Sequence, residues 1–330
     1  MMGLYAVSGG GLQRLEPQAQ LADGLAKASW IDLNAPTEEE ETAVERAIGV
    51  DVPTREEMRD IEESSRIYER KGALFLTGVI ITGIAEHRPR RTEVSFVLTP
   101  EHLVTVRYAD PLPFKLFEQK CARQPEEHNS ADRLFISLIE QIVQRIADIL
   151  EKITTELDGV AGDVFREEGA AAKDETHPPR IDLQSIVRRL GRSSALLGKL
   201  RESLLSFSRI LSFVRRSAET WLKDEVKEKA KSLERDLTSL AEYAEHLSAQ
   251  IGHLQEATFN LINIEQNRVI KVFSIAAVLF LPPTLVATLY GMNFKYMPEL
   301  NWVLGYPFSL LLMIASAIIP YYWFKRNNWL

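Results

Sequence analysis

The stretch VFSIAAVLFLPPTLVATLYGMNF, residues 272–294, contains 23 consecutive residues without a charge and is rich in Leu, Val, Ala and Phe. A second uncharged stretch of 25 residues, 300–324, follows after a short connection. A helix rises about 1.5 Å per residue, so either stretch exceeds the roughly 30 Å hydrocarbon core of a bilayer. Two buried helices of a soluble core are the weaker interpretation, because such helices rarely run this far without a charge. We therefore predict two membrane spans.

The charges around the two stretches predict their orientation. Basic residues gather outside the stretches rather than between them: Arg268, Lys271, Lys325 and Arg326, against Lys295 and Glu299 in the connection. Because cytoplasmic flanks carry the excess of Lys and Arg, we expect both termini in the cytoplasm. The first residues lack the basic and apolar regions of a signal peptide, and the single Cys121 suits a reducing compartment.

Charge is divided unevenly along the 330 residues, whose formal net charge is −7. Residues 266–330 hold five basic residues and one acid, which leaves 34 basic and 45 acidic residues, a net charge of −11, on residues 1–265. A cytosolic body this acidic argues against nucleic acid as a partner and is compatible with binding cations.

Residues 1–125 mix short β-rich segments with short helices, which predicts an α+β domain: a sheet with flanking helices, like an α/β/α sandwich. The β-branched runs bounded by Gly, Pro or Asp lie at 73–83, 92–100 and 102–110. Thr37 and Glu40 form a capping box that predicts a helix through about Ile48. The basic loop EHRPRR, 86–91, is interpreted as a solvated hairpin turn rather than an anion site.

Beyond Asn129 the pattern becomes helical and long. Apolar residues recur at spacings of three and four from Phe135 to Val160 and from Leu183 to Val214, which is typical of coiled-coil-like helices. The joint at 167–180 contains Gly, two prolines and clustered charge, so the two helices should form a hairpin. A third helix should begin near Lys223 and continue into the first apolar stretch as one rod of about 65 residues, roughly 100 Å long.

The sequence contains only weak signals for a catalytic site or a nucleotide-binding site. The acids on the long helices are mostly a solvated face, and no His or Ser lies at a spacing that would complete a triad. The segment GRSSALLGKL, 191–200, has glycines seven apart instead of five, and Leu200 replaces the Ser or Thr of a phosphate loop. The sequence therefore predicts neither an enzyme nor a nucleotide site.

Small and polar residues follow one face of the first apolar helix. They step by three and four positions: Asn267, Ile270, Ser274, Ala277, Leu281, Thr284 and Thr288. Such a stripe marks close helix packing more often than a pore wall, so both interpretations stay open. A pore would require several copies around an axis, because one helix cannot enclose a water-filled path. Pro282 and Pro283 must disturb the backbone hydrogen bonds and predict a flexible point.

The segment YGMNF, 290–294, followed by MPEL, 297–300, resembles the signature of the CorA family of divalent-cation channels. The hallmark of that family is Gly-Met-Asn at the outer end of the first of two spans. The resemblance extends to INIEQNRVIKVFS (262–274), LPPTLVA (281–287) and YWFKRNNWL (322–330). The amino-terminal domain is similar to the family in layout rather than by motif.

The resemblance implies a homopentameric funnel in the inner membrane that conducts Mg²⁺, with Co²⁺ and Ni²⁺ as alternative substrates and lipid as its surroundings. By residue match, Gly291, Met292 and Asn293 take the role of selectivity filter. The family's pore-lining positions correspond to Asn267, Ile270, Phe273, Ala277, Leu281 and Thr284, of which only Phe273 lies off the stripe.

The expected segments follow from this layout: a cytosolic α/β domain at 1–125, a helical hairpin at 126–222, a pore-lining helix at 223–290 with the first span at about 270–290, an outer loop at 291–301, the second span at 302–325 and a cytosolic tail at 326–330.

The chemistry of hydrated Mg²⁺ suits an asparagine at the filter. Mg²⁺ gives up its water reluctantly, so a selective mouth should recognise the hydrated ion. Neutral Asn293 carboxamides accept hydrogen bonds from the ion's waters, whereas carboxylates would slow its release. Gly291 is expected to permit a backbone bend. Lys295 stands where many relatives carry an acid, which leaves Glu299 as the negative group of the outer mouth.

The membrane potential is a sufficient driving force. At roughly 2.3 kcal/mol per charge per 100 mV, a divalent cation gains about 4.6 kcal/mol on entry, so the pore must be shut when cytosolic Mg²⁺ is ample. The resemblance implies regulatory Mg²⁺ bound between cytosolic subunits, where it would screen their mutual repulsion. Acids at 140–168 and 224–236 are candidate ligands, and Ile270, Phe273 and Leu281 a candidate constriction.

Two alternatives remain open at this stage. One is a membrane-tethered scaffold or sensor, in which the long helices bind a partner and the spans only anchor. The other keeps the same fold but moves Zn²⁺, Co²⁺ or Ni²⁺ as the physiological ion. Met292 counts against Zn²⁺, because zinc-transporting branches of the family usually carry Val there.

Overall fold

The computed structural model describes residues 2–8, 11–15, 21–60, 62–124, 128–165, 182–295 and 297–327. The chain divides into two compact units, Met1–Leu254 and Gln255–Leu330. The predicted joint at 167–180 and the last three residues of the predicted tail lie outside the described residues.

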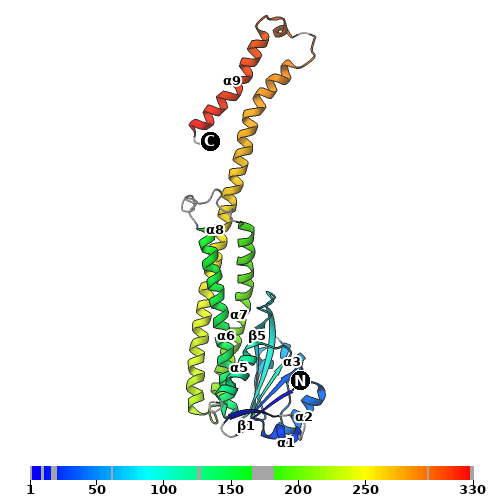
Figure 1. Cartoon of the computed structure of the whole chain (residues 1–330), viewed down its shortest axis with the longest axis vertical. Helices are drawn as coiled ribbons and strands as arrows, with labels where there is room; N and C mark the ends of the chain where they lie inside the picture. Colours follow the sequence, from blue (N-terminus) through cyan, green and yellow to red (C-terminus); the bar gives the residue numbers. More distant parts are fainter. Residues whose placement is uncertain are drawn as a thin grey trace. The chain divides into compact units, whose positions relative to one another are not determined.

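A seven-stranded sheet forms the centre of the first unit (Figure 1). In order across the sheet, the strands are β2 (Gly11–Leu15), β1 (Met2–Ser8), β3 (Trp30–Asn34), β7 (Leu103–Arg107), β6 (Arg90–Leu98), β5 (Ala73–Thr82) and β4 (Ile67–Arg70). β3 and β7 pair in parallel, and all other neighbours pair antiparallel. The predicted strands correspond to β5, β6 and β7. Residues 86–89 of the basic loop lie in the turn of the β5–β6 hairpin, whereas Arg90 and Arg91 already belong to β6.

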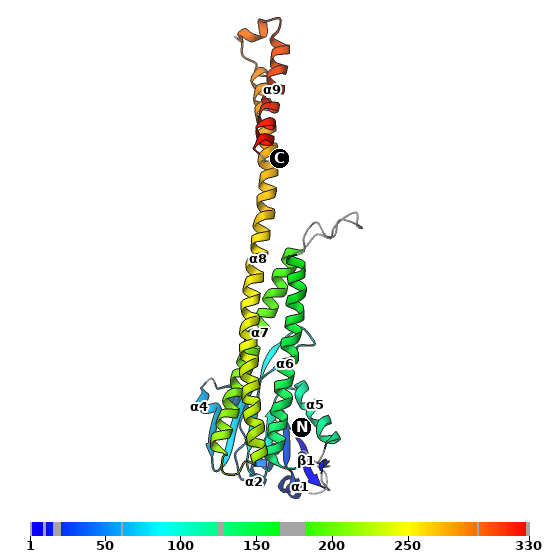
Figure 2. The same ribbon diagram turned by 90° about the vertical axis from the view of Figure 1, so that its left-hand side faces the viewer.

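Helices cover both faces of this sheet (Figures 1 and 2). One face packs against α1 (Leu21–Lys27), α2 (Glu38–Ile48) and α3 (Arg55–Arg59), whose buried Leu25, Val44 and Met58 share a core with the strands. On the other face, the ring of Phe96 contacts Phe135 and Phe207, at centroid distances of 5.8 and 6.4 Å. These two residues belong to α6 (Ala131–Val164) and α7 (Leu183–Ser217). The predicted sandwich of a sheet between helical layers is therefore confirmed.

Local sequence explains where the elements begin. Thr37 accepts a hydrogen bond from the Glu40 backbone N–H, and the Glu40 side chain accepts one from the Thr37 backbone N–H, so the predicted capping box is present. Two shorter helices complete the domain, α4 (Glu63–Arg66) and α5 (Leu112–Arg123). The ring of Phe117 on α5 packs edge-on against Trp30 at 5.1 Å, which holds α5 over the sheet.

The long helices pack through the apolar positions that the spacing indicated. Leu157 and Val160 of α6 and Leu190 and Leu211 of α7 are fully buried. The third long helix is α8 (Asp224–Tyr290), a single helix that contributes residues to both units. Its first part is tied to α6, where the hydroxyls of Thr154 and Tyr243 lie 2.7 Å apart in a hydrogen bond.

A charged contact joins three helices of the first unit. Glu140 of α6 accepts hydrogen bonds from Lys120 of α5 and Lys229 of α8, each at 2.9 Å. Burial alone would raise the pKa of the Glu140 carboxyl, but the two lysine ammonium groups outweigh it and hold that pKa below its ordinary value. Glu140 therefore stays ionised and links the helices.

The second unit contains the last part of α8, the short turn η2 (Pro298–Asn301) and α9 (Gly305–Arg326). Both views show α9 running back beside the end of α8 (Figures 1 and 2).

Candidate functional site

Two helices of the chain, α8 and α9, are long and apolar enough to cross a membrane. Their most apolar windows of 18 residues have mean hydropathies of 2.1 and 1.5, and only 0% and 11% of those windows is buried. A core helix of a soluble protein would be mostly buried, so the interpretation of two soluble core helices does not fit.

Helix α9 covers only one side of α8. Ile275 is 9% exposed, and a groove of about 540 Å³ between the two helices is lined on α8 by Leu279, Phe280 and Pro283. With 3.6 residues per turn, the stripe of small and polar residues lies roughly half a turn around the α8 axis from Ile275 and Leu279, which places it on the opposite side of the helix. Its seven members, Asn267, Ile270, Ser274, Ala277, Leu281, Thr284 and Thr288, and the neighbouring Phe273 are all exposed. The second apolar helix of the same chain is therefore not the packing partner of this stripe.

The two threonines of the stripe donate their hydroxyl hydrogens to their own helix. The Thr284 hydroxyl donates to the Phe280 carbonyl and the Thr288 hydroxyl to the Thr284 carbonyl, each at 2.7 Å. With the hydrogen engaged, each hydroxyl oxygen presents its lone pairs to a neighbouring molecule. The exposed face of the stripe thus offers hydrogen-bond acceptors, which the residue types alone do not reveal because a hydroxyl can also donate.

Pro282 and Pro283 lie inside α8, which continues without a break to Tyr290. Neither proline carries an N–H, so the carbonyls of Val278 and Leu279 lack their usual helical donors, as the sequence indicated. The helix tolerates the two prolines here, and the predicted flexibility stays a prediction.

The Gly-Met-Asn segment begins where α8 ends. The Gly291 N–H donates to the Ala287 carbonyl at 2.9 Å and closes the last turn, and Met292, Asn293 and Phe294 follow as exposed residues outside regular structure. Lys295 is also exposed, whereas the side chain of the predicted outer-mouth residue Glu299 lies outside the described part of the chain.

The role expected of Gly291, to permit a backbone bend, stays a prediction. Its φ is outside the left-handed region that favours glycine, so the chain leaves α8 without a left-handed φ at this residue. Instead, a Cβ at this position would lie 3.2 Å from the Ala287 carbonyl oxygen, which is a tight contact. The close contact that a Cβ would make with the end of α8 therefore limits the size of the side chain at position 291.

Several of the acids considered as regulatory ligands are already paired with basic residues. Glu140 is bound by two lysines, as described above, and the other paired acids are Glu156 and Asp163 with Arg189, Asp224 with Lys227, Glu225 with Arg133, and Glu234 with Arg215. Among the described residues of the same segments, Glu151, Asp158, Glu228 and Asp236 are exposed and have no ion pair.

Comparison with known proteins places these features in a family. Residues 26–326 match the family model described as CorA-like Mg²⁺ transporter protein. The chain belongs to the CorA family. It is 33% identical to the magnesium transport protein CorA of Escherichia coli (strain K12) over 330 residues, which cover 100% of both chains. It is also 33% identical to the magnesium transport protein CorA of Salmonella typhimurium, again over the full length of both. The family description is that of a transporter and not of an enzyme.

Solved structures confirm the CorA fold. The complete structure of the CorA magnesium transporter from Methanocaldococcus jannaschii aligns with a TM-score of 0.75 at 18% identity, covering 100% of this chain and 99% of that one. The full-length CmaX protein aligns with a TM-score of 0.68 at 22% identity, covering 99% and 98%. At these identities the likeness supports the fold: an α/β domain, long helices and two apolar helices at the carboxy-terminal end.

Proposed function

We propose that this CorA family member is a passive Mg²⁺ uptake channel of the inner membrane, assembled as a homopentamer with both termini in the cytoplasm. The observation that carries the proposal is the Gly-Met-Asn segment directly after the apolar part of α8, in a chain whose match to the CorA-like Mg²⁺ transporter family spans residues 26–326. The relatives at 33% identity are named as magnesium transport proteins, which supports Mg²⁺ as the ion.

Asn293 is the group proposed to select the ion, with Gly291 and Met292 shaping the filter around it. Its exposed position beyond the last turn of α8 leaves the carboxamide available to a hydrated ion. Several copies of a neutral amide oxygen accept hydrogen bonds from the waters of Mg²⁺ without stripping them. A neutral ring also releases the ion again, which conduction requires.

The exposed stripe of α8 is proposed as the pore wall. If the α8 helices of several copies surround an axis, the stripe faces that axis while α9 lies on the outer side, toward lipid. The lone pairs of Thr284 and Thr288 would then point to the water around the ion. Bulky Ile270, Phe273 and Leu281, each more than 60% exposed in the single chain, would form the constriction that closes by dewetting.

Cytosolic Mg²⁺ is proposed as the regulatory ligand as well as the cargo. The excess of acids on residues 1–265 makes the subunits repel one another, and a divalent cation bound between them would lower that repulsion. Carboxylates that are free of basic partners are the better candidates for such a site, which favours Glu151, Asp158, Glu228 and Asp236 over Glu140 or Glu156.

Ion flux into liposomes tests the proposal. The purified chain is reconstituted with a Mg²⁺-sensitive dye inside, and a negative-inside membrane potential is imposed with a potassium gradient. We expect Mg²⁺ entry from the wild-type chain and its loss in Asn293→Ala. The matched control is Asn301→Ala, an exposed asparagine of the same connection between the spans, which should keep wild-type flux. Unchanged Mg²⁺ entry in Asn293→Ala would contradict the proposal.

The same liposomes separate the alternatives. A membrane-tethered scaffold or sensor is not favoured, because the family match extends through both apolar helices; such a protein would show no flux at all. Parallel measurements with Co²⁺, Ni²⁺ and Zn²⁺ rank the ions. We expect Mg²⁺ to carry the flux at millimolar concentration, and Met292→Val to raise the share of Zn²⁺.

A further inference from the structure

Strand β6 of the central sheet extends beyond its neighbour β7 and leaves an open edge on that side. Pairing between β6 and β7 ends at Val94 and Arg107, whereas pairing between β6 and β5 continues to Arg90 and Thr82. Residues 90–93 therefore lack a strand partner on the β7 side within the described part of the chain. Because alternate residues of an antiparallel strand direct their N–H and C=O groups to each side, part of this backbone faces the open edge.

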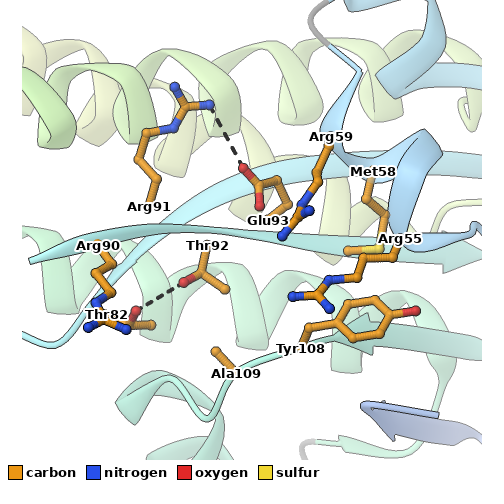
Figure 3. Close-up of a pocket in the computed structure, with 10 residues that line it drawn as sticks. All are labelled: Arg55, Met58, Arg59, Thr82, Arg90, Arg91, Thr92, Glu93, Tyr108 and Ala109. Carbon is orange, nitrogen blue, oxygen red and sulfur yellow. Dashed lines mark hydrogen bonds and ion pairs between the residues drawn. The ribbon is translucent and has the colours of Figure 1, made fainter.

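A cavity of about 210 Å³ lies at this open edge (Figure 3). The short helix α3 contributes Arg55 and Arg59, β6 contributes Arg90 and Arg91, and Tyr108 follows the end of β7. Pockets for drug-sized ligands usually measure about 300–1,000 Å³. This cavity is smaller, so it suits a compact group rather than a whole nucleotide or a peptide.

One of the four arginines has carboxylate partners. The Arg91 guanidinium pairs with Glu202 of α7 at 3.0 Å and lies 3.9 Å from Glu93, the one acid of the cavity lining. Figure 3 shows the Arg91 and Glu93 side chains on the same side of the strand, directed at each other. Arg91, Glu93 and Glu202 together carry a charge of −1, so they offset one of the three positive charges of the other arginines and leave a net charge of +2 around the cavity.

The other three arginines are exposed and have no ion pair among the described residues. Arg55 lies over the ring of Tyr108, 4.9 Å from its centroid, which orients the guanidinium without neutralising it. Arg59 and Arg90 approach the cavity from α3 and from β6. Like charges that line one small cavity repel one another, so a bound anion would lower their mutual repulsion.

Hydroxyl groups complete the lining. Thr82 and Thr92 share a hydrogen bond of 2.9 Å, in which one hydroxyl donates and the other keeps its hydrogen for a further acceptor. The Tyr108 hydroxyl is directed away from Thr82, Thr92 and Arg90 (Figure 3), so Tyr108 contributes the ring under Arg55 and not a donor. Guanidinium forks and hydroxyl donors around a small cavity are the groups that bind phosphate oxygens.

We propose that this cavity is a binding site for a phosphate or diphosphate group, held mainly by Arg59 and Arg90 with Arg55 and the threonine hydroxyls as further donors. The site lies in the cytosolic α/β domain and is separate from the Gly-Met-Asn segment and the α8 stripe. The group has two possible sources, a free phosphate anion or the phosphates of a nucleotide whose remaining part stays outside the cavity. Both sources share the chemistry that the cavity recognises.

Titration calorimetry on the full-length protein tests the site. The chain is purified in detergent in buffer without divalent cations and titrated with potassium diphosphate. We expect saturable binding that is at least tenfold weaker in Arg59→Gln/Arg90→Gln. The matched control is Arg46→Gln/Arg201→Gln, which removes two exposed arginines without ion pairs elsewhere in the described residues and should change the Kd less than twofold. The variant Arg59→Lys/Arg90→Lys keeps the charge but not the fork, and should bind with intermediate affinity.

Further titrations distinguish the two possible sources of the phosphate group and define the results that would overturn the proposal. ATP binding tenfold tighter than diphosphate would assign the group to a nucleotide, whereas equal affinities would assign it to the free anion. Potassium sulfate at the same ionic strength should not saturate the site in the same concentration range. Absence of saturable diphosphate binding by the wild-type chain, or equal weakening in the cavity variant and in the control variant, overturns the proposal. Thermal unfolding of each variant verifies that it is folded before titration.

Discussion

Replacing Asp32 with asparagine should destabilise the first unit, Met1–Leu254, more than any exposed charge change. Asp32 on β3 accepts hydrogen bonds from Arg107 on β7, with Nη2 at 2.9 Å from Oδ2 and Nε at 3.1 Å from Oδ1. The two side chains are only 5% and 7% exposed. Desolvation lowers the pKa of Arg107, but the carboxylates outweigh it and raise that pKa above its ordinary value, so the guanidinium remains charged.

The expected loss of stability depends on the interactions that Arg107 keeps in the Asp32→Asn variant. Removing one partner of a buried ion pair costs about 3–5 kcal/mol, because the other charge stays buried. Asp110 still contacts Arg107 at 3.1 Å, and an asparagine carbonyl accepts one of the lost hydrogen bonds, so we expect the lower end, about 3 kcal/mol. For a unit of about 250 residues, 1 kcal/mol shifts the Tm by about 2–4 °C. The expected shift is therefore about 6–12 °C.

Thermal unfolding of the full-length protein in detergent, followed by tryptophan fluorescence, measures this shift. Trp30 reports on the site directly, because its indole N–H donates to Thr105, which in turn donates to Asp32. The control is Asp51→Asn, whose ion pair with Arg70 at 2.9 Å is more than half exposed and should matter by less than 2 °C.

Equal Tm shifts in Asp32→Asn and in the exposed control would refute the reasoning. The double variant Asp32→Asn/Arg107→Met sharpens the test, because removing both charges should recover most of the lost stability. A double variant as unstable as Asp32→Asn alone would show that packing, and not the unpaired guanidinium, sets the cost.

Three further outcomes are expected. The Glu140 carboxylate, whose folded pKa is lowered, contributes stability that is fully present above its ordinary pKa of 4.5 and is lost as pH falls through the lower folded pKa, so Glu140→Gln should flatten the acid limb of a Tm–pH profile. Gly78→Ala should cost about 1–3 kcal/mol in unfolding experiments, since its Cβ would lie 2.9 Å from the Phe207 ring, whereas Gly198→Ala, with no atom within 4 Å, should be neutral or stabilising. Burial raises the pKa of Cys121 to about 12, so a maleimide should label it at pH 7.5 only after denaturation; rapid labelling of the native protein would contradict its burial.

Much of the architecture could be predicted from the sequence, because it depends on the spacing of apolar residues and on the length of the uncharged stretches. The capping box at Thr37 and the apolar spacing from Phe135 to Val160 depend on neighbours three and four positions away, so local chemistry suffices. The length of the charge-free runs likewise predicts α9 and the end of α8 as membrane-crossing helices. The bend expected at Gly291 stays a prediction: its φ lies outside the left-handed region, and the residue type alone does not show which φ the chain uses.

The sequence by itself determined the two apolar helices, the position of Gly-Met-Asn after the first of them and the stripe of small and polar residues, since each is a pattern within one segment. Only the tertiary structure decided which side of α8 is covered by α9 and which acids of the long helices are already paired with basic residues. It also brought Arg59 of α3 and Arg90 of β6, 31 positions apart in the chain, to one cavity at an open strand edge. Such juxtapositions depend on how helices and strands pack across the sheet, which no spacing along one segment encodes.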